Sequence, residues 1–353
     1  MPQWAASLQR WQWAQIAGTA LSSVEPAVRP LGNSGPRSKI EAWNGATLRR
    51  RGSVYMLGAA GGHGDYAGNE VNALALYSET PKWVELRAPS ANSTVLNETQ
   101  FYLDNRPAAT HTYSATQFVG RLDRMVVIAS PGLLGQFPAA PSGYPYTGDK
   151  RSYSFDYAKS DWDAPDHIAA FPGNGDYIAC LCVRHPLTDD IYYSRSYSDG
   201  WYRWTSAANR WDKLSNVSRN PWYAGSAIDT RRDRILIVGG WDPMAPELRT
   251  LAGTRISATF GGLGASALTM GSGAGVIYDE VNDIFIVAFN SDGIIKLLTV
   301  TAGDLTVASP SLSGETPAAR PNGVRNSLQY VPELGGMVVA NSYTGNVYFM
   351  RTS

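Results

Sequence analysis

The fold is decided by the stretch RRRGSVYMLGAAGGHGDYAGNEVNALALYSETPKWVEL, residues 49–86. An apolar strand, a glycine-rich loop, an alternating strand and an edge strand with one large aromatic follow one another at residues 52–58, 61–66, 69–76 and 82–86. Alternation of polar and apolar residues at period two is typical of a half-buried strand. A further strand, expected at residues 40–48, precedes them. Four short antiparallel strands in succession predict one blade of a β-propeller.

The unit must recur, because a single four-stranded blade cannot bury both of its faces. Its centre is a turn of Asp, Arg or Gly residues that leads into an apolar strand. Copies of this centre occur at residues 121–128, 231–240, 280–287 and 332–339, with a weaker copy at 187–193. The sequence therefore predicts an all-β fold, a single six-bladed propeller of four-stranded antiparallel blades. Seven blades remain the alternative, since an insertion in the second unit has room for part of another blade.

The repeat places the whole chain, residues 1–353, in one domain. The expected blades are residues 38–89, 105–165, 166–216, 220–262, 270–312 and 320–353. The last unit ends at residues 348–351 after only three strands. We therefore expect the N-terminal segment, residues 1–21, to supply its outer strand from the run at 12–19. Closing the ring in this way removes the exposed sheet edges that would otherwise promote aggregation.

Strand-end diglycines followed by a tryptophan resemble the kelch repeat. These marks occur as Gly61-Gly62 with Trp83, as Gly239-Gly240 and as Trp211. The stretches at 62–71 and 106–113 also look like those of uncharacterised kelch-like proteins of bacteria and their phages. The resemblance implies a propeller and a setting but no activity, because kelch-type propellers include oxidases, lyases, isomerases and binding modules.

Composition limits the classes of partner. The chain has zero formal net charge and 17% charged residues, whereas a nucleic-acid binder is normally basic, so we expect no nucleic-acid partner. No apolar run is long enough to insert into a membrane and no signal peptide is visible, which predicts a virion-associated or cytoplasmic protein. The 24 Arg against six Lys favour ion pairs within the fold or bidentate recognition of carboxylates and sulfates.

Two features of the middle units need separate interpretation. Cys180 and Cys182 stand two residues apart on one strand and face the same side, which predicts buried free thiols. We expect neither a metal nor another cofactor. The insertion at 131–150 carries Phe137, Tyr144 and Tyr146 among prolines and glycines, and is interpreted as a lid beside a binding face or as a contact with a partner.

Candidate site residues follow from propeller geometry. The loops between the second and third strands of each blade, and the connections between blades, open on one face and converge on the central channel. The residues expected to bind a ligand there are Trp43, Asn44, Asp65, Tyr66, Arg106, His167, Tyr223, Trp241, Asp242 and Asn326, together with Trp222. If the protein is an enzyme, its catalytic residues are expected to be His63, His111, Tyr113 and Arg325. This mixture of imidazole, phenol, guanidinium and indole groups suits sugar binding or acid–base chemistry.

Two functions remain open. The first is non-catalytic recognition of a glycan or a protein partner through this face, as in a tail or capsid-associated component of a phage that assembles with other virion proteins. The second is a polysaccharide lyase, similar to the propeller-type lyases that act on ulvan. Elimination from a uronate needs a base, an acid and a cation, which His111 or His63, Tyr113, and Arg106 or Arg325 would supply.

Overall fold

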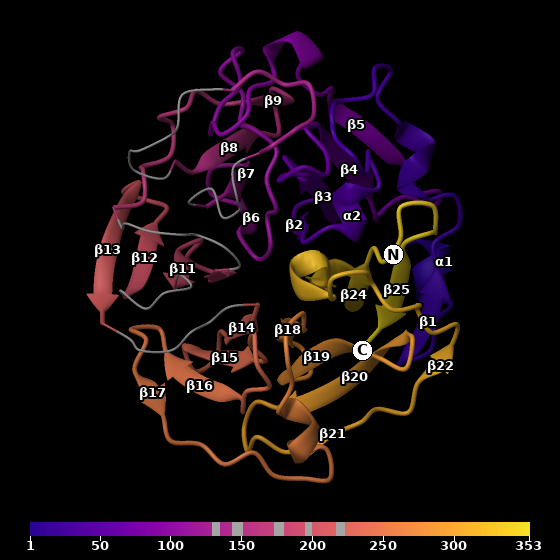
Figure 1. Cartoon of the computed structure of the whole chain (residues 1–353). Helices are drawn as coiled ribbons and strands as arrows, with labels where there is room; N and C mark the ends of the chain where they lie inside the picture. Colours follow the sequence, from indigo (N-terminus) through magenta and orange to yellow (C-terminus); the bar gives the residue numbers. More distant parts are fainter. Residues whose placement is uncertain (129–134, 143–150, 173–179, 195–199, 217–222) are drawn as a thin grey trace.

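Six β-sheets are arranged as blades around a central axis (Figure 1). The computed structural model describes residues 1–128, 135–142, 151–172, 180–194, 200–216 and 223–353. Five sheets have four strands each in antiparallel meander order, and the sixth has a short fifth strand. The predicted all-β, six-bladed propeller is confirmed.

The first three blades each follow the chain order from the centre outward. Blade 1 consists of β2 (Thr47–Arg49), β3 (Val54–Gly58), β4 (Val71–Ala75) and β5 (Trp83–Arg87). Blade 2 consists of β6 (Thr116–Val119), β7 (Arg124–Val127), β8 (Tyr153–Asp156) and β9 (Asp161–Trp162). Blade 3 consists of β10 (Leu181–Arg184), β11 (Ile191–Ser194), β12 (Trp201–Thr205) and β13 (Arg210–Ser215). The second strands are apolar and buried because both of their faces pack against neighbouring blades.

Blades 4 and 5 repeat this order, and blade 6 departs from it. Blade 4 consists of β14 (Gly225–Asp229), β15 (Arg234–Val238), β16 (Glu247–Thr250) and β17 (Arg255–Ile256). Blade 5 consists of β18 (Gly275–Asp279), β19 (Ile284–Ser291), β20 (Ile294–Thr301) and β21 (Val307–Ala308). Blade 6 consists of β23 (Gln329–Val331), β24 (Gly336–Val339), β25 (Tyr348–Arg351), β1 (Gln12–Gln15) and β22 (Ser313–Gly314).

The helices are all single turns in the connections. They are α1 (Gln3–Ala6), η1 (Leu21–Val24), α2 (Ser38–Glu41), η2 (Asn92–Thr94), η3 (Ala265–Leu268), η4 (Arg325–Ser327) and η5 (Pro332–Leu334). None of the helices in the described residues is long and apolar enough to cross a bilayer.

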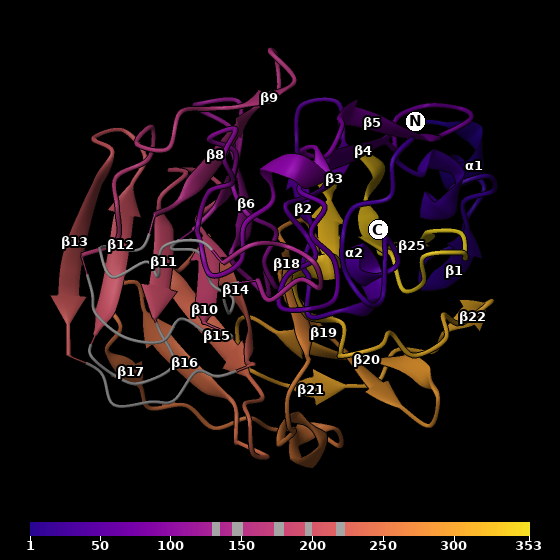
Figure 2. The ribbon, with the colours of Figure 1, turned by 45° about the horizontal axis from the view of Figure 1, so that its top comes forward.

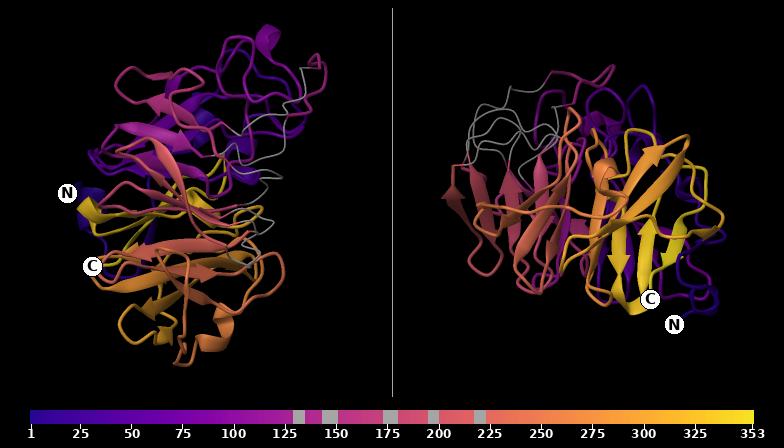
Figure 3. Two further views of the ribbon diagram at one scale, coloured as in Figure 1. Left: turned by 90° about the vertical axis from the view of Figure 1, so that its left-hand side faces the viewer. Right: turned by 90° about the horizontal axis from the view of Figure 1, so that it is seen from below.

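The N-terminal strand closes the ring, as the sequence predicts. β1 pairs antiparallel with β25, with Trp13 opposite Met350 and Gln15 opposite Tyr348. Trp13 is only 1% exposed and packs between blades 5 and 6. Both termini lie on the same face of the ring, as Figure 3 shows, and the N-terminal amine lies beside β5 in Figure 2, 3.0 Å from the Tyr77 hydroxyl of blade 1.

Two expected inner strands are shorter than predicted. The expected strand at 40–48 begins only at Thr47, and residues 38–41 form α2 instead. The sequence of residues 110–118 likewise predicts the inner strand of blade 2, and this strand begins only at Thr116. Residues before these strands make contacts between blades, such as Tyr113 N–H to Trp43 O at 2.8 Å, in place of a sheet ladder. The alternation of polar and apolar residues therefore begins before the residues that pair in the sheet. The residues wrongly predicted as strand in both segments include predicted site residues.

The repeat centre recognised in the sequence is the turn between the first and second strands. A residue with positive φ stands in each of the six turns: Ser53, Asp123, Asp189, Asp233, Asp283 and Gly335. Ser, Asp and Gly suit this position because glycine has no Cβ and short polar side chains form local hydrogen bonds that support left-handed backbone. These turns define the lower face of the ring, and the opposite loops define its upper face.

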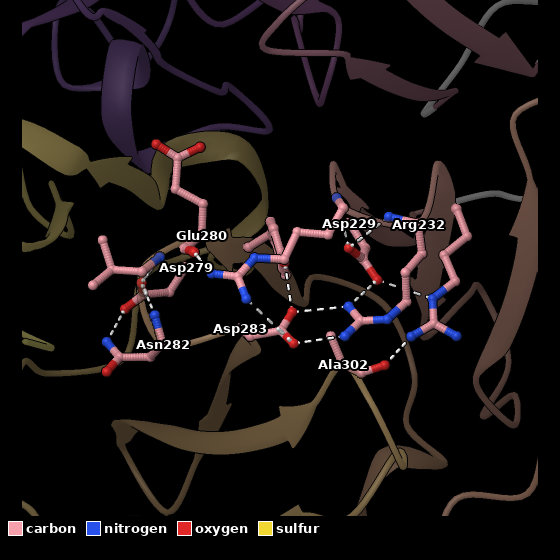
Figure 4. Close-up of polar contacts among 11 residues, drawn as sticks. Asp229, Arg232, Asp279, Glu280, Asn282, Asp283 and Ala302 are labelled. Carbon is pink, nitrogen blue, oxygen red and sulfur yellow. Dashed lines mark hydrogen bonds and ion pairs between the residues drawn. The ribbon is translucent and has the colours of Figure 1, made fainter.

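Polar contacts join neighbouring blades on the lower face. Arg49 donates to Asp123 at 2.7 and 3.1 Å, which joins blades 1 and 2. His185 Nε2 lies 3.1 Å from Asp233, joining blades 3 and 4, and Arg232 binds Asp283 through two nitrogens at 2.9 and 2.6 Å, joining blades 4 and 5. Figure 4 shows the last pair, in which Arg232 also reaches Asp229.

The other three blade junctions are joined in the same region. The Arg121 backbone N–H donates to Asp189 at 2.7 Å, the hydroxyl of Thr352 donates to Asp279 at 2.6 Å, and the Ser53 hydroxyl donates to Glu333 at 3.1 Å. We call this set of contacts, with those of Arg49, His185 and Arg232, the lower belt. Arginines therefore form ion pairs within the fold, and in the lower belt these pairs join neighbouring blades.

Candidate functional site

Eight of the predicted site residues come together on the upper face. They are Trp43, His63, Asp65, His111, Tyr113, Tyr223, Trp241 and Arg325, and we call this set the upper mouth. His63 and Asp65 lie in the β3–β4 loop, and Trp241 follows β15. The others immediately precede the inner strands β2, β6, β14 and β23. Because these loops all open on one face, residues more than 250 positions apart in the chain meet there.

The rings of the upper mouth form a continuous chain. Trp43 and His111 have ring centroids 5.1 Å apart, and His63 stacks on His111 at 6.0 Å. His111 contacts Tyr113 at 6.0 Å.

Tyr113 meets Tyr223 at 5.6 Å, and Tyr223 meets Trp241 at 5.2 Å. Trp241 is 59% exposed and His63 is also exposed, whereas His111 and Tyr113 are each 5% exposed. The upper mouth therefore has a buried floor and an exposed aromatic rim. Burial and the neighbouring Tyr223 raise the pKa of Tyr113, so its phenol is protonated at neutral pH.

His111 and Asp65 form the polar pair of the floor. His111 Nε2 lies 2.9 Å from Asp65 Oδ2, and the Ser34 hydroxyl donates to the other carboxylate oxygen at 3.2 Å. Hydrogen bonding from His111 lowers the pKa of Asp65. Burial lowers the pKa of His111 and outweighs the attraction of Asp65. At neutral pH the pair is thus a neutral imidazole that donates Nε2–H to a carboxylate.

Arg325 lies beneath the tyrosines. Its guanidinium carbon is 4.6 Å from the centre of the Tyr223 ring and 5.5 Å from that of Tyr113. Nε donates to Asn322 O at 2.7 Å. No carboxylate of the described residues forms an ion pair with it. Burial lowers the pKa of Arg325 to about 10, which still leaves it charged at neutral pH.

A second buried guanidinium stands behind Arg325. Arg320 is 1% exposed and donates to three backbone carbonyls, those of Ala340, Gly323 and Asn44. Its hydrogen bonds are therefore used inside the fold. The charges of Arg320 and Arg325 together make the floor of the upper mouth electropositive.

The backbone of the upper mouth is unusual. His63, Tyr113, Tyr223 and Arg325 have φ of 50°, 45°, 60° and 47°. Left-handed backbone is uncommon for residues with bulky side chains, and such residues cluster at functional sites. Gly62 permits the close approach, since a Cβ there would lie 2.4 Å from the backbone nitrogen of His111.

A cleft of about 320 Å³ adjoins Trp43 and Asp65. Its other polar lining residues are Ser34, Arg37, Ser38, Glu41 and Asn322. None of these five is among the site residues predicted from the sequence. Residues 34 and 37 stand in a segment interpreted only as a connection, and Glu41 was placed in a strand, whereas α2 puts it one turn from Arg37, 3.7 Å away.

Three predicted ligand-binding residues lie close to the upper mouth but serve the fold. Tyr66 is fully buried and donates to Glu70 at 2.7 Å. Asn44 accepts from Thr112 N–H at 2.9 Å. Asn326 donates to the carbonyls of two inner-strand segments at 2.9 and 2.8 Å. Their side-chain hydrogen bonds join the loops that carry the upper mouth.

Other predicted residues lie elsewhere. Arg106 pairs with Asp104 at 3.1 Å and approaches Asp161 of the outermost strand β9 at 3.5 Å. His167 lies near the β12–β13 turn, where its carbonyl accepts from Asn209. β9 has only two residues, so the chain leaves blade 2 at its outer edge and carries His167 away from the upper mouth. Asp242 is exposed beside Trp241, and Trp222 lies outside the described residues.

Part of the predicted insertion borders the upper mouth. Gln136 N–H donates to His63 O at 2.7 Å, and Phe137 is 2% exposed in a cluster with Val95 and Tyr102. Tyr144 and Tyr146 lie outside the described residues. The contact at His63 places the described part of the insertion, residues 135–142, at the border of the upper mouth.

The cysteines are buried and free, as predicted. Burial raises the pKa of Cys180 to about 12, so neither nucleophilic nor metal-binding chemistry is favoured there. Within the described residues, no group of three or more His, Cys, Asp or Glu side chains is arranged to hold a metal ion.

Comparison with known proteins supports the fold alone. No model of a protein family matches the chain, and no curated protein matches its sequence. A solved structure that resembles it is a structural genomics protein of unknown function from Bacteroides thetaiotaomicron VPI-5482, with a TM-score of 0.53 and 12% identity. The alignment covers 96% of this chain and 74% of that chain. The kelch resemblance therefore extends to the architecture, while membership of the kelch family is not shown.

Proposed function

We propose that the protein is a recognition propeller whose upper mouth binds an acidic saccharide. The observation that carries this proposal is Arg325, a buried guanidinium with no carboxylate partner among the described residues. A buried charge without a partner is costly, and a ligand carboxylate or sulfate would offset that cost. The planar fork of a guanidinium suits both groups.

The aromatic rim supplies the second element of a sugar site. Trp43 and Tyr223 are half-buried and Trp241 is exposed, so each presents ring surface to solvent. An amphipathic ring can cover the apolar face of a pyranose while its polar neighbours bind the hydroxyls. Sites for small ligands combine such apolar surface with a few fixed polar groups.

The polar groups are already fixed in position. Asp65 is held by His111 and Ser34, and its remaining accepting capacity faces the cleft that it lines with Trp43. Asn322, bonded through its carbonyl to Arg325, lines the same cleft. A saccharide with its acidic group at Arg325 would therefore place neighbouring units over Trp43 and Asp65.

Calorimetric titration with a panel of acidic and neutral oligosaccharides tests the proposal. We expect acidic members to bind, and Arg325→Gln and Trp241→Ala each to weaken binding by about tenfold or more. Arg255→Gln removes an exposed arginine of β17 and serves as the matched control, with unchanged binding. Absence of binding to every acidic member, or equal binding by wild type and Trp241→Ala, would contradict the proposal.

The lyase is retained as a second candidate because His111, Tyr113 and Arg325 lie side by side. A neutral imidazole, a protonated phenol and a cation are the groups that β-elimination requires. However, Nε2 of His111 is engaged by Asp65, which favours recognition. Ultraviolet absorbance of unsaturated uronates during the same titrations distinguishes the two. Product that disappears in His111→Ala would establish the lyase.

A further inference from the structure

A separate pocket on the lower face is lined by arginines. It encloses about 350 Å³ between the turns of blades 1, 2 and 3. The arginines on its wall are Arg49, Arg50, Arg51, Arg121 and Arg184, and we call it the lower arginine pocket. Arg50 and Arg184 also line the central channel, so the pocket stands at the lower end of that channel.

Two of these arginines have carboxylate partners within the pocket. Arg49 is paired with Asp123 at 2.7 Å, and Arg184 is paired with Asp189 at 2.8 Å. These contacts belong to the structure of the ring. They account for both carboxylates that line the pocket.

The other three guanidinium groups are not matched in this way. Arg50 reaches Glu280, across the channel, only at 3.4 Å, and both side chains are about one-third exposed at 32% and 30%. Arg51 and Arg121 are exposed, and within the described residues their guanidinium groups have no carboxylate partner. Burial and the nearby charge of Arg50 lower the pKa of Arg184, in keeping with an excess of positive charge.

Closure of the ring does not require so large an excess of arginines over carboxylates. At the junction of blades 4 and 5, Arg231, Arg232 and Arg234 face Asp229 and Asp283, which is an excess of one cation, whereas the lower arginine pocket has five arginines and two carboxylates. The junctions of blades 1, 2 and 3 carry more cations than carboxylates on the same kind of turn. The surplus cations therefore point to a ligand.

We propose that the lower arginine pocket binds a compact oxyanion with at least two negative charges, a phosphate or sulfate ester group. Guanidinium groups bind such oxyanions through paired hydrogen bonds. Arg51 and Arg121 make the direct contacts, since Arg49 and Arg184 are held by aspartates. The pocket is large enough for a diphosphate or a sulfated sugar unit. This site is distinct from the upper mouth and lies on the opposite face.

Calorimetric titration with inorganic pyrophosphate tests the proposal. Wild type should bind it, and the double variant Arg51→Gln/Arg121→Gln should bind about 10- to 100-fold more weakly, because two charge-assisted contacts are lost. Both side chains are exposed and have no carboxylate partner in the part of the chain that the structure describes, so the melting temperature without ligand should stay unchanged. Added NaCl should weaken wild-type binding by screening.

Two controls locate the site. Arg255→Gln removes an exposed arginine outside the pocket, and Trp241→Ala alters the upper mouth; both should bind pyrophosphate as wild type does. Stronger binding of pyrophosphate than of inorganic sulfate would assign the pocket to phosphate groups, and the reverse order to sulfate groups. No wild-type binding of either anion, or unchanged binding in the double variant, would overturn the proposal.

Discussion

The two ends of the blades use polar residues in opposite ways. In the lower belt, Arg232 binds Asp283 of the next blade, and its charge is neutralised. In the upper mouth, Arg325 is more deeply buried than Arg232, yet it faces tyrosine rings and a backbone carbonyl. A cation that meets a carboxylate stabilises the ring, whereas a buried cation without one is available to a ligand. The difference separates the face that holds the fold from the face that we assign to binding.

The backbone shows the same contrast. Positive φ recurs in all six lower turns and is carried by Ser, Asp or Gly, residue types that tolerate it. In the upper mouth it is carried by His63, Tyr113, Tyr223 and Arg325, residue types with large side chains for which it is uncommon. Positive φ at Ser, Asp or Gly marks the turns of the architecture, whereas positive φ at residues with large side chains marks the site. The lower arginine pocket is the exception to a purely structural lower face.

The largest effect is expected from breaking the ring itself. Removing residues 1–20 deletes β1, its ladder to β25 and the buried Trp13. The loss should exceed about 5 kcal/mol of unfolding free energy, because a single buried Trp already contributes about 3 to 5 kcal/mol. Thermal denaturation followed by circular dichroism measures it. An unchanged melting temperature would show that closure by β1 contributes little.

A smaller loss of stability is expected from the lower belt. Hydrogen bonds from Arg232 lower the pKa of Asp283, so this carboxylate stabilises the fold above the unfolded pKa of about 4 and loses that effect as the pH falls through its folded value. Asp283→Asn should cost about 1 to 2 kcal/mol at pH 7, since the pair is partly exposed and screened.

Urea denaturation at several pH values measures that difference. Wild type and Asp283→Asn should converge in stability at strongly acidic pH, and saccharide binding should stay unchanged. Asp242→Asn, an exposed aspartate on the upper face, is the matched control with no loss of stability. Equal stability of Asp283→Asn and wild type at pH 7 would show that the pair of Arg232 and Asp283 in the lower belt does not stabilise the fold.

Breaking the pair of His111 and Asp65 in the upper mouth should cost less stability than breaking the lower belt, but it should shift the pKa of His111. Burial lowers the pKa of His111 below its usual value of about 6.5. The contribution of His111 to the free energy of unfolding is therefore present above that value, and it is lost as the pH falls through the lower pKa of the folded state. Asp65→Asn removes the charge that opposes this shift, so the pKa of His111 should fall further, with a loss of about 1 kcal/mol at pH 7. NMR titration of the imidazole tests this, and a higher pKa in the variant would contradict it.

The smallest effect on stability is expected at the rim. Trp241 is 59% exposed, so Trp241→Ala should change the unfolding free energy by less than about 0.5 kcal/mol while saccharide affinity falls by about tenfold. Trp13→Ala is the matched comparison, with the same substitution at 1% exposure and the reverse pattern. Similar losses of stability in the two variants would break the distinction between the faces.

Much of the fold followed from local pattern. The turn centred on Asp123, Asp233 and Asp283 recurs in the sequence, because four of the six blades have Asp at the position of positive φ. The missing fourth strand of the last blade correctly pointed to the N-terminus. The prediction of inner strands at 40–46 and 110–115 was wrong. There, residues in an alternating pattern make contacts between blades instead of pairing in a β-ladder.

The sequence by itself determined the repeat, the closure and the loops from which the site is built. Only the tertiary structure decided which loop residues meet: it brought His111 to Asp65 and Arg325 to Tyr223, and it placed Arg106 and His167 elsewhere. The physical reason is that strand patterns are local, set by pairing and burial within a blade. The meeting of residues 43, 111, 223 and 325 depends on how six blades curve into one ring.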